Sequence, residues 1–508
     1  MKSIFRATAI LSGSSIINIL VSIASAKVLA LFLQPVGYGY YGLLQSFVGV
    51  TSLLAGLGMA TGLVRLGARA AKQNDESTLA ALRGGAWFLF SVLGGVTLLC
   101  LFFFRVTLSR WALGSPDHGW TIVLMGFALM FTVGGNIQMG MLNAYHRVGA
   151  LAKYAIANTL GSAVFTIGAV VVWRSKGIVP AVIASAAINW AASHYFLRRE
   201  VARISVRPTR KETLKSAWAL MQFGGPFTAS ILVGTGVQLA LPMVVVHLLN
   251  PESVGYYKAA AGISVGYLGF LVTAMGQDYY PRVSAVSHQP QSLVKLINEQ
   301  HRLVMLIGAP IILGMLALVP LIIPIVYSHK FTPAVDILEW QLIGDLFKFS
   351  SWTMAFAILA RCKSSVYFLT ESIGGTATLV TTWLGVRWFG MTGLGASFLA
   401  TYIIYYFAVW LIIRREVPLV WTRSNKRMML GAVTAALIIR ILPMTRFAAL
   451  RTPVALALAL IAGVPSLFIL WREFVGSKDL ESQPLPGGQN VSTAVAVEER
   501  SEVSQIVP

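Results

Sequence analysis

Two nine-residue stretches decide how this chain folds, because they resemble each other. Residues 33–41 read Leu-Gln-Pro-Val-Gly-Tyr-Gly-Tyr-Tyr, and residues 249–257 read Leu-Asn-Pro-Glu-Ser-Val-Gly-Tyr-Tyr. Leu, Pro, Gly, Tyr and Tyr coincide at one offset of 216 residues, without a gap. Such self-similarity indicates that one structural unit occurs twice. The alternative is that a Pro-x-x-x-Gly-Tyr pattern ends one helix and starts the next at a membrane interface, with no duplication.

The composition around these stretches is that of a membrane protein. Of the 508 residues, 56% are hydrophobic and 12% are charged, and the mean hydropathy is +0.72. A soluble domain carries about 25% charged residues, so half that density cannot coat a globule of this size. The composition therefore excludes a disordered chain, a disulfide scaffold and a soluble nucleic-acid-binding protein.

Apolar stretches of about 20 residues, bounded by charges or by Pro and Gly clusters, mark the helices that can cross a bilayer. The sequence contains fourteen of them, at 8–33, 40–64, 85–104, 120–143, 151–173, 178–197, 216–248, 254–276, 303–327, 335–360, 365–386, 392–413, 428–443 and 452–471. An even number of spans leaves both termini on one side of the membrane.

Each copy of the repeat follows the first helix of a six-helix set, so the two sets have the same orientation. The sequence therefore predicts an all-α integral membrane protein of about 14 transmembrane helices, with two parallel six-helix lobes and two C-terminal helices. We expect lobes at residues 1–210 and 211–420, two extra helices at 421–472 and a disordered cytoplasmic tail at 473–508.

The net charge of +21 is distributed unevenly across the predicted membrane. With the N-terminus in the cytoplasm, 28 of the 40 Lys and Arg residues lie on the cytoplasmic side and nine on the other. This bias predicts cytoplasmic termini and explains most of the positive charge as topology and attraction to membrane lipids, with no nucleic-acid partner.

The loops show no signature of an enzyme. The two cysteines, Cys100 and Cys362, cannot form a disulfide framework or a metal site, and no Walker A, GxSxG, HExxH or CxxC motif occurs in a cytoplasmic loop. The sequence therefore predicts a protein that is not an enzyme and has neither a cofactor nor a metal.

Small polar residues recur at helical spacing in several spans. The stripes are Thr8, Ser12, Ser15, Asn18, Ser22 and Ser25 in the first span, Asn158, Ser162 and Thr166 in the fifth, and Ser185, Asn189 and Ser193 in the sixth. Helix packing through small residues explains any single stripe. Several stripes on neighbouring helices fit a hydrated cleft better than tight packing.

Ionisable residues within the spans are more informative, because a charge near the bilayer centre costs at least about 2.5 to 3.5 kcal/mol. Lys27, Lys258 and Lys348 are the basic residues deep in spans, and Asp345 and Glu371 are the acids of interest. Asp345 and Lys348 lie three residues apart, so a purely structural pair is an equal alternative. Lys258 could instead extend to the interface.

The cytoplasmic mouths of the predicted spans carry Arg65, Arg147 and Arg282, although a single Arg at such a place is usually a topology signal. No span of the first lobe contains Asp or Glu. A carrier of cationic drugs would need carboxylates in its cleft, whereas ammonium and guanidinium groups suit a phosphate or carboxylate cargo.

The first 75 residues resemble the Wzx-type flippases, the O-antigen and common-antigen translocases of the MOP superfamily, whose relatives include the MATE drug exporters and the lipid II flippase. The resemblance lies in Lys27-Val-Leu-Ala, Pro35, Gly39-Tyr-Tyr-Gly42, Leu53-Leu-Ala-Gly-Leu-Gly58 and Gly62-Leu-Val-Arg65. It implies a carrier of undecaprenyl-pyrophosphate-linked oligosaccharide across a bacterial inner membrane. Lys27 and Arg65 occupy basic positions of that family.

On this hypothesis the protein is a flippase for polysaccharide, O-antigen or exopolysaccharide biosynthesis that works by alternating access. Lys27, Lys258 and Lys348 would attract the pyrophosphate or acidic sugars of the polyprenyl-linked cargo. Arg65, Arg147 and Arg282 would stand at the entrance, and Asp345 and Glu371 would sense a coupling ion. Polymerase or export proteins of the same pathway are the expected partners.

Two other classes of function remain as alternatives. A MATE-like cation-coupled multidrug exporter is disfavoured because the first lobe lacks an intramembrane carboxylate. A membrane polymerase or ligase of the same glycans is disfavoured because no long outer loop is present.

Overall fold

The fold was obtained as a computed structural model, which describes residues 2–201, 206, 208–362, 364–444 and 450–482. Nearly all of these residues are helical, and no strand occurs among them, so the predicted all-α fold is confirmed. The first part of the chain forms α1 (Lys2–Gly56), α2 (Met59–Lys72), α3 (Glu76–Phe103), α4 (Arg105–Leu113), α5 (Gly119–Ala144), α6 (Val148–Trp173) and α7 (Ile178–Glu200).

The rest of the chain continues in the same way. It forms α8 (Arg210–Leu248), α9 (Pro251–Ala261), α10 (Gly269–Ala285), α11 (Pro290–Val326), α12 (Ala334–Arg361), α13 (Ser364–Glu416), α14 (Arg423–Ile441) and α15 (Arg451–Ser482). Five short turns join these helices, namely η1 (Pro116–His118), η2 (Arg174–Gly177), η3 (Gly262–Tyr267), η4 (His329–Phe331) and η5 (Leu442–Met444).

Each of the fourteen predicted spans lies on a helical segment, although one long helix can hold two spans. α1 bends at Gln34 (φ 57°, ψ 177°), directly before Pro35, so it contains the first span and most of the second. α13 bends at Gly390 (φ 57°, ψ −128°) between the eleventh and twelfth spans. Within the described residues, eight helical stretches are long and apolar enough to cross a bilayer. The chain is a multi-pass membrane protein.

Two of the predicted spans are interrupted. The second is broken between α1 and α2 at Leu57 and Gly58, both with positive φ, where the backbone of Gly58 lies directly against that of Gly224. The eighth passes from α9 through the π-helical turn η3 into α10. The tail predicted from residue 473 begins within α15, and its residues 483–508 lie outside the described part of the chain.

Side-chain caps fix where α3 and α8 begin. Asp75 accepts hydrogen bonds from the backbone N–H of Thr78 at 3.0 Å and from the hydroxyls of Ser77 and Thr78 at the start of α3. These bonds lower the pKa of the Asp75 carboxyl to about 2, because they stabilise its charged form. α8 begins with a capping box between Thr209 and Glu212.

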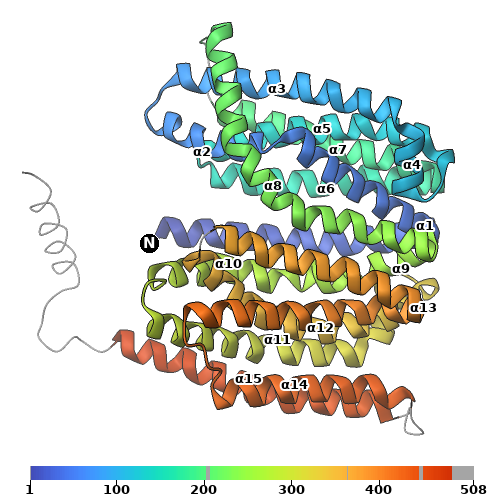
Figure 1. The fold of residues 1–508 in the computed structure, drawn as a ribbon, viewed down its shortest axis with the longest axis vertical. Coiled ribbons are helices and arrows are strands. Elements are labelled where there is room, and N and C mark those ends of the chain that lie inside the picture. The colour runs from blue at the N-terminus through green and yellow to red at the C-terminus, as the bar shows by residue number, and fades with distance from the viewer. Residues whose placement is uncertain (1, 202–205, 207, 363, 445–449, 483–508) are drawn as a thin grey trace, which may run out of the picture.

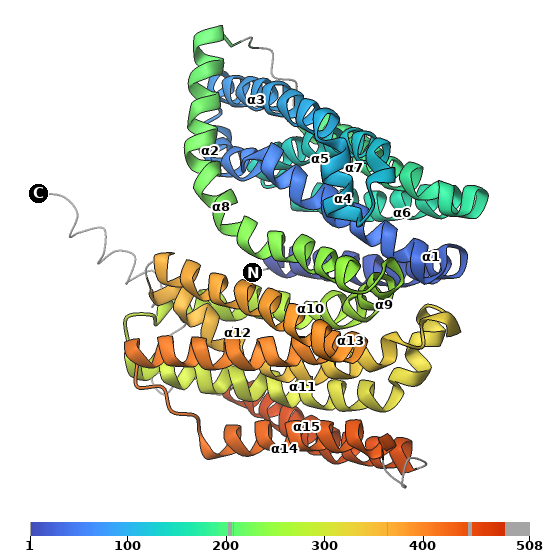
Figure 2. The same cartoon turned by 45° about the vertical axis from the view of Figure 1, so that its right-hand side comes forward.

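The helices form two groups that lie one above the other in Figures 1 and 2. We call α1–α7 the first lobe and α9–α13 the second lobe, and α14 and α15 pack on α11 at the far side of the second lobe. α8 connects them, because it packs on α2 and α3 and also on α13. The predicted lobe boundary at residue 210 therefore falls at the start of a shared helix, and the division of the chain stays a prediction.

Buried apolar side chains form two separate clusters. The larger cluster includes Leu43 of the first lobe and Val254 of the second. The smaller cluster includes Met59 and Ile137 of the first lobe together with Leu220 of α8. The two lobes thus share one core at the end where α1 bends, and the first lobe has a core of its own at the opposite end.

The repeated stretches lie against each other at the bend. Gly39 is packed so closely on α9 that an added Cβ would overlap the Pro251 carbonyl oxygen and lie 2.9 Å from the Gly255 nitrogen. A Cβ added at Gly255 would in turn overlap the Pro35 carbonyl oxygen. Because the offset of 216 pairs Pro35 with Pro251 and Gly39 with Gly255, the contact is self-complementary, as at a two-fold interface.

Replacing either glycine of this crossing by alanine should force the lobes apart. We expect Gly39→Ala and Gly255→Ala each to lower the thermal unfolding midpoint by several degrees, because overpacking costs about 1–3 kcal/mol. Gly49→Ala is the matched control in the same helix, since a Cβ there has nothing within 4 Å. Unfolding followed by size-exclusion chromatography of heated detergent samples measures the effect, and equal midpoints for all three variants would contradict the close crossing.

Candidate functional site

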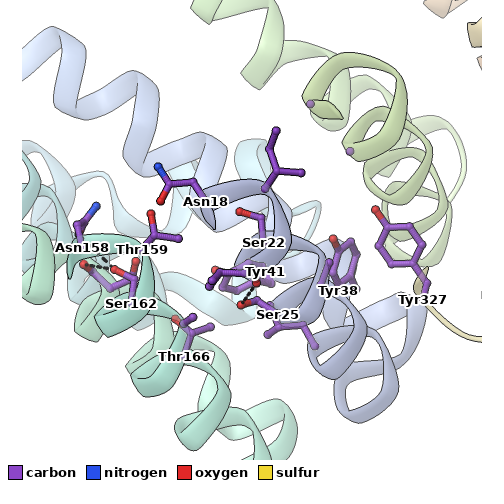
Figure 3. Close-up of a pocket in the computed structure, with 18 residues that line it drawn as sticks. Asn18, Ser22, Ser25, Tyr38, Tyr41, Asn158, Thr159, Ser162, Thr166 and Tyr327 are labelled. Carbon is purple, nitrogen blue, oxygen red and sulfur yellow. Dashed lines mark hydrogen bonds between the residues drawn. The ribbon is translucent and has the colours of Figure 1, made fainter. Parts of the chain in front are cut away.

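A cavity of about 590 Å³ lies on the side of the first lobe that faces the second lobe, and we call it the polar cavity. Its wall is formed by α1, α6 and α7, and it is bordered on the other side by η3 and Tyr327 of the second lobe (Figure 3). Eleven of its eighteen lining residues carry a hydroxyl or an amide: Asn18, Ser22, Ser25, Tyr38, Tyr41, Asn158, Thr159, Ser162, Thr166, Ser185 and Tyr327. None of these eighteen described residues is Asp, Glu, Lys, Arg or His.

Parts of the polar stripes of the sequence line this cavity. Asn189 and Ser193 of the sixth-span stripe do not: Asn189 accepts a hydrogen bond from the Tyr154 hydroxyl, and the Ser193 hydroxyl donates to Gln138 at 2.9 Å. Asn18, Ser22 and Ser25 are three or four residues apart and face it from α1. Asn158 and Ser162 face it from α6, where the Ser162 hydroxyl donates to the Asn158 amide oxygen at 3.3 Å. The cleft interpretation of several stripes together therefore fits better than packing alone.

One lining group has an unused hydrogen-bonding capacity. The Asn18 Oδ1 is inaccessible to solvent and has no hydrogen-bond partner among the described residues. A buried acceptor without a partner is uncommon, because its desolvation is not compensated. This acceptor therefore lacks a hydrogen bond in this conformation.

The π-helical turn η3 forms the second-lobe side of the cavity. Gly262 and Gly266 of this turn line it, and the Tyr327 hydroxyl lies beside Gly262. On the same turn, the Ser264 hydroxyl donates to Asp345 Oδ2 at 2.7 Å. π-helical turns are rare and are frequently found at functional sites. Periodicity at 3.6 residues could not have predicted this turn.

Two of the predicted binding lysines connect the lobes instead of lining the cavity. Lys27 Nζ of α1 donates to the Pro324 carbonyl oxygen of α11 at 3.0 Å. Lys258 Nζ of α9 donates to Ser46 Oγ of α1 at 2.8 Å, and its side chain lies over Gly42, the residue that the repeat offset pairs with it.

The third predicted lysine is paired and buried. Lys348 Nζ lies 3.3 Å from Asp345 Oδ1, and the two side chains are 5% and 0% exposed. The ammonium group also lies 5.8 Å from the ring centroids of Phe398 and Tyr402. The structure thus contains the pair that the sequence allowed, and neither partner lines the polar cavity.

The other predicted site residues lie apart from the cavity as well. Glu371 is half-buried in α13 and accepts a hydrogen bond from the Tyr405 hydroxyl at 3.0 Å. Arg65 is exposed, and its guanidinium lies 4.8 Å from the Phe223 ring centroid.

Arg147 is exposed directly before α6. Arg282 is paired with Asp278 at 3.6 Å and donates to Gln300 at 3.3 Å.

Sequence reasoning missed a second buried charge network. Arg440 of α14 lies 3.3 Å from Glu339 of α12 and also pairs with Asp336, and Arg451 of α15 pairs with Glu339. Both arginines belong to the nine basic residues that the sequence places on the side of the membrane opposite the cytoplasm. The two acids lie on α12, and the two arginines follow about 100 residues later in the sequence. No local sequence pattern relates residues so far apart, so this network could not be predicted without the fold.

The amino-acid sequence was compared with families and with known proteins. Residues 28–336 match a family described as polysaccharide biosynthesis protein, which is more than half of the chain. The chain belongs to the polysaccharide biosynthesis protein family. The matched range contains both copies of the repeat and every residue of the polar cavity from Leu29 to Tyr327.

Among curated relatives, the lipid III flippases of Escherichia coli K12 and Shigella flexneri are each 23% identical over 417 residues, covering 80% of this chain and 96% of theirs. Among solved structures, the lipid II flippase MurJ in an inward closed conformation matches with a TM-score of 0.71 and 13% identity, covering 92% of this chain and 99% of that one. An inward-facing MATE transporter matches with a TM-score of 0.63 and 15% identity, covering 81% and 96%. The predicted MOP-superfamily fold is confirmed.

Chemical labelling of introduced cysteines tests whether water reaches the polar cavity of this polysaccharide biosynthesis protein. In a chain without its two native cysteines, Ser22→Cys should react with a small water-soluble thiol reagent at least about ten times faster than Thr353→Cys. Ser22 lines the cavity, whereas Thr353 is fully buried. Equal rates, measured by mass spectrometry of the labelled protein, would mean that the cavity is not reached by water.

The buried ion pair can be tested by a double-mutant cycle. Lys348→Met alone should destabilise the protein by about 3–5 kcal/mol, because it leaves the Asp345 carboxylate buried and uncompensated. Asp345→Leu combined with Lys348→Met should recover most of that loss. Chemical unfolding in detergent measures both values, and a double variant as unstable as the sum of the single variants would show that the two charges do not interact.

Proposed function

We propose that this protein is a non-enzymatic flippase. It carries undecaprenyl-pyrophosphate-linked oligosaccharide across a bacterial inner membrane by alternating access, for the synthesis of a polysaccharide such as O-antigen or exopolysaccharide. The polar cavity is the observation that carries this proposal. Its hydroxyl and amide groups both donate and accept hydrogen bonds, as the hydroxyl groups of a sugar require.

The family and the relatives support the cargo. The chain belongs to a polysaccharide biosynthesis family, and the relatives that cover most of it are named as flippases of lipid-linked molecules. A cavity of about 590 Å³ is within the usual range for ligand sites, about 300–1,000 Å³. In our proposal the sugars occupy this cavity while the polyprenyl chain stays in the lipid.

The uncharged cavity changes where the pyrophosphate is expected. Charged lysines deep in the cleft were the sequence-based hypothesis, but the ammonium groups of Lys27 and Lys258 contact protein groups of the opposite lobe. We propose that the pyrophosphate instead meets the exposed guanidinium groups of Arg65 and Arg147 at the cytoplasmic end, with Arg282 as a further candidate from the second lobe.

The orientation follows from the Lys and Arg bias, which supports cytoplasmic termini. The end where α1 bends is then the outer end, and there the lobes share their core. At the cytoplasmic end the first lobe has a separate core. We infer that this conformation receives cargo from the inner leaflet.

Opening toward the outer leaflet would require several contacts to break. These are the Gly39–Pro251 crossing and the hydrogen bonds of Lys27 and Lys258, which we propose as the outer gate.

Asp345 is a candidate for sensing a coupling ion, because the Ser264 hydroxyl that donates to it belongs to η3, which lines the polar cavity. Glu371 is the second candidate. Polymerase and export proteins of the pathway are the proposed partners.

Deleting the gene and complementing it tests this proposal. The deletion should accumulate the lipid-linked glycan precursor in the inner leaflet, and the wild-type gene should remove it. We expect Ser22→Leu to fail in complementation, because its larger apolar side chain occupies part of the polar cavity. Ser91→Leu is the control, since Ser91 is an exposed serine of α3 outside the cavity.

Two results would contradict the proposal. One is full complementation by Ser22→Leu at wild-type protein level, which would remove the role of the polar cavity. The other is a deletion strain with normal surface glycan whose overexpressing counterpart resists cationic drugs, which would favour a MATE-like exporter.

A further inference from the structure

A second cavity, of about 770 Å³, lies at the bend of α1, and we call it the bend cavity. It is separate from the polar cavity, because the two share no lining residue. The first lobe supplies most of its wall, around Gln34 in α1 and Arg174 in η2. The second lobe contributes Glu252 of α9 and Lys330 of η4, so the cavity joins the two lobes.

The bend cavity is lined by both apolar and charged side chains. The apolar ones are Phe32, Leu33, Leu44, Leu113, Ile178 and Val179. Arg174 and Lys330, one from each lobe, are its exposed cations, and neither has an ion pair within the described ranges of the chain. The carboxylate of Glu252 accepts a hydrogen bond from the Tyr256 hydroxyl at 2.6 Å. Apolar wall and cations together fit an amphiphile with an anionic headgroup.

Exposed aromatic side chains mark the level of the bend cavity in the membrane. Trp173 directly precedes Arg174, Trp120 directly precedes the lining residue Thr121, and the two indoles are 57% and 64% exposed. Trp111 and Phe103 are exposed at the same end of the first lobe, where α4 lies in Figure 1. Exposed Trp in a membrane protein is enriched at the level of the lipid headgroups. The cations of the cavity are therefore at the height of lipid phosphates.

The backbone around the cavity is unusual in the same place. Gln34 (φ 57°) and Arg174 (φ 49°) are two of the five described non-glycine residues with positive φ, and both line the bend cavity. Such conformations are energetically unfavourable and cluster at ligand sites. They add to the argument from charge and position.

We propose that the bend cavity binds the phosphate headgroup of a lipid, with Arg174 and Lys330 on the phosphate and the chain of the lipid along the apolar wall. This site is distinct from the polar cavity and does not depend on which cargo the protein carries. Because its two cations come from different lobes, a lipid bound there favours the conformation in which the lobes meet at the bend.

The purified full-length protein in neutral detergent tests this site with three probes: phosphatidylglycerol, phosphatidylcholine and inorganic phosphate. We expect phosphatidylglycerol to raise the thermal midpoint and to be retained in native mass spectra. The double variant Arg174→Gln, Lys330→Gln should weaken its apparent affinity by about ten-fold or more. Lys176→Gln is the matched control, because Lys176 is an exposed cation of the same turn, η2, that does not line the cavity.

Each outcome decides for or against the site. Loss of the phosphatidylglycerol effect in the double variant but not in Lys176→Gln supports it. An equal loss in Lys176→Gln means that only general surface charge attracts the lipid, and equal stabilisation by phosphatidylcholine means ordinary solvation by lipid. An equal effect of inorganic phosphate means a site for soluble anions, and each of these three results overturns the proposal. If the double variant does not fold, Lys330→Gln alone, in the exposed turn η4, gives the same comparison.

Discussion

The close crossing of the two repeated stretches is the constraint on which the rest of the structure depends. Because Gly39 and Gly255 have no side chains, the backbone of each lobe reaches the proline carbonyl of the other. This approach brings α9 against α1 and joins the apolar residues of both lobes into one core at that end. The polar cavity lies along the same helix, α1, directly beyond this contact. A bulkier residue at either glycine would change the position of every helix that lines it.

The buried charges of this structure contact other parts of the protein and do not line the polar cavity. The lysines deep in the spans fasten one part of the protein to another, as Lys27 does to Pro324 and Lys258 does to Ser46. The cavity itself is formed by neutral groups. Since buried ions are stable only when paired or hydrogen-bonded, a free ammonium in a dry closed state would be costly. A neutral wall avoids that cost whether or not cargo is bound.

Local patterns were enough to predict the helical spans and part of the lining of the polar cavity. None of the eight charged residues that the sequence suggested for the site lines this cavity. Spacings of three and four placed Asn18 and Ser22 on one face, and the same rule brought Asp345 next to Lys348. Contacts between distant parts of the chain could not be predicted in this way. Lys27 bonds to a residue 297 positions later, and no periodicity encodes that distance. The π-helical turn was also missed, because it has more residues per turn than the 3.6 of the α-helix, which the stripes assume.

The two unequal apolar cores have an energetic consequence for movement. Separating the lobes at the bend would expose side chains of the shared core, at about 25 cal/mol for each square ångström uncovered. A few hundred square ångströms would already amount to several kcal/mol. A carrier can alternate only if its two conformations differ by a few kcal/mol. Under the proposed alternating access, the ends of the two lobes opposite the bend would have to bury a comparable apolar area when they close, so that each half of the cycle exchanges one shared core for another.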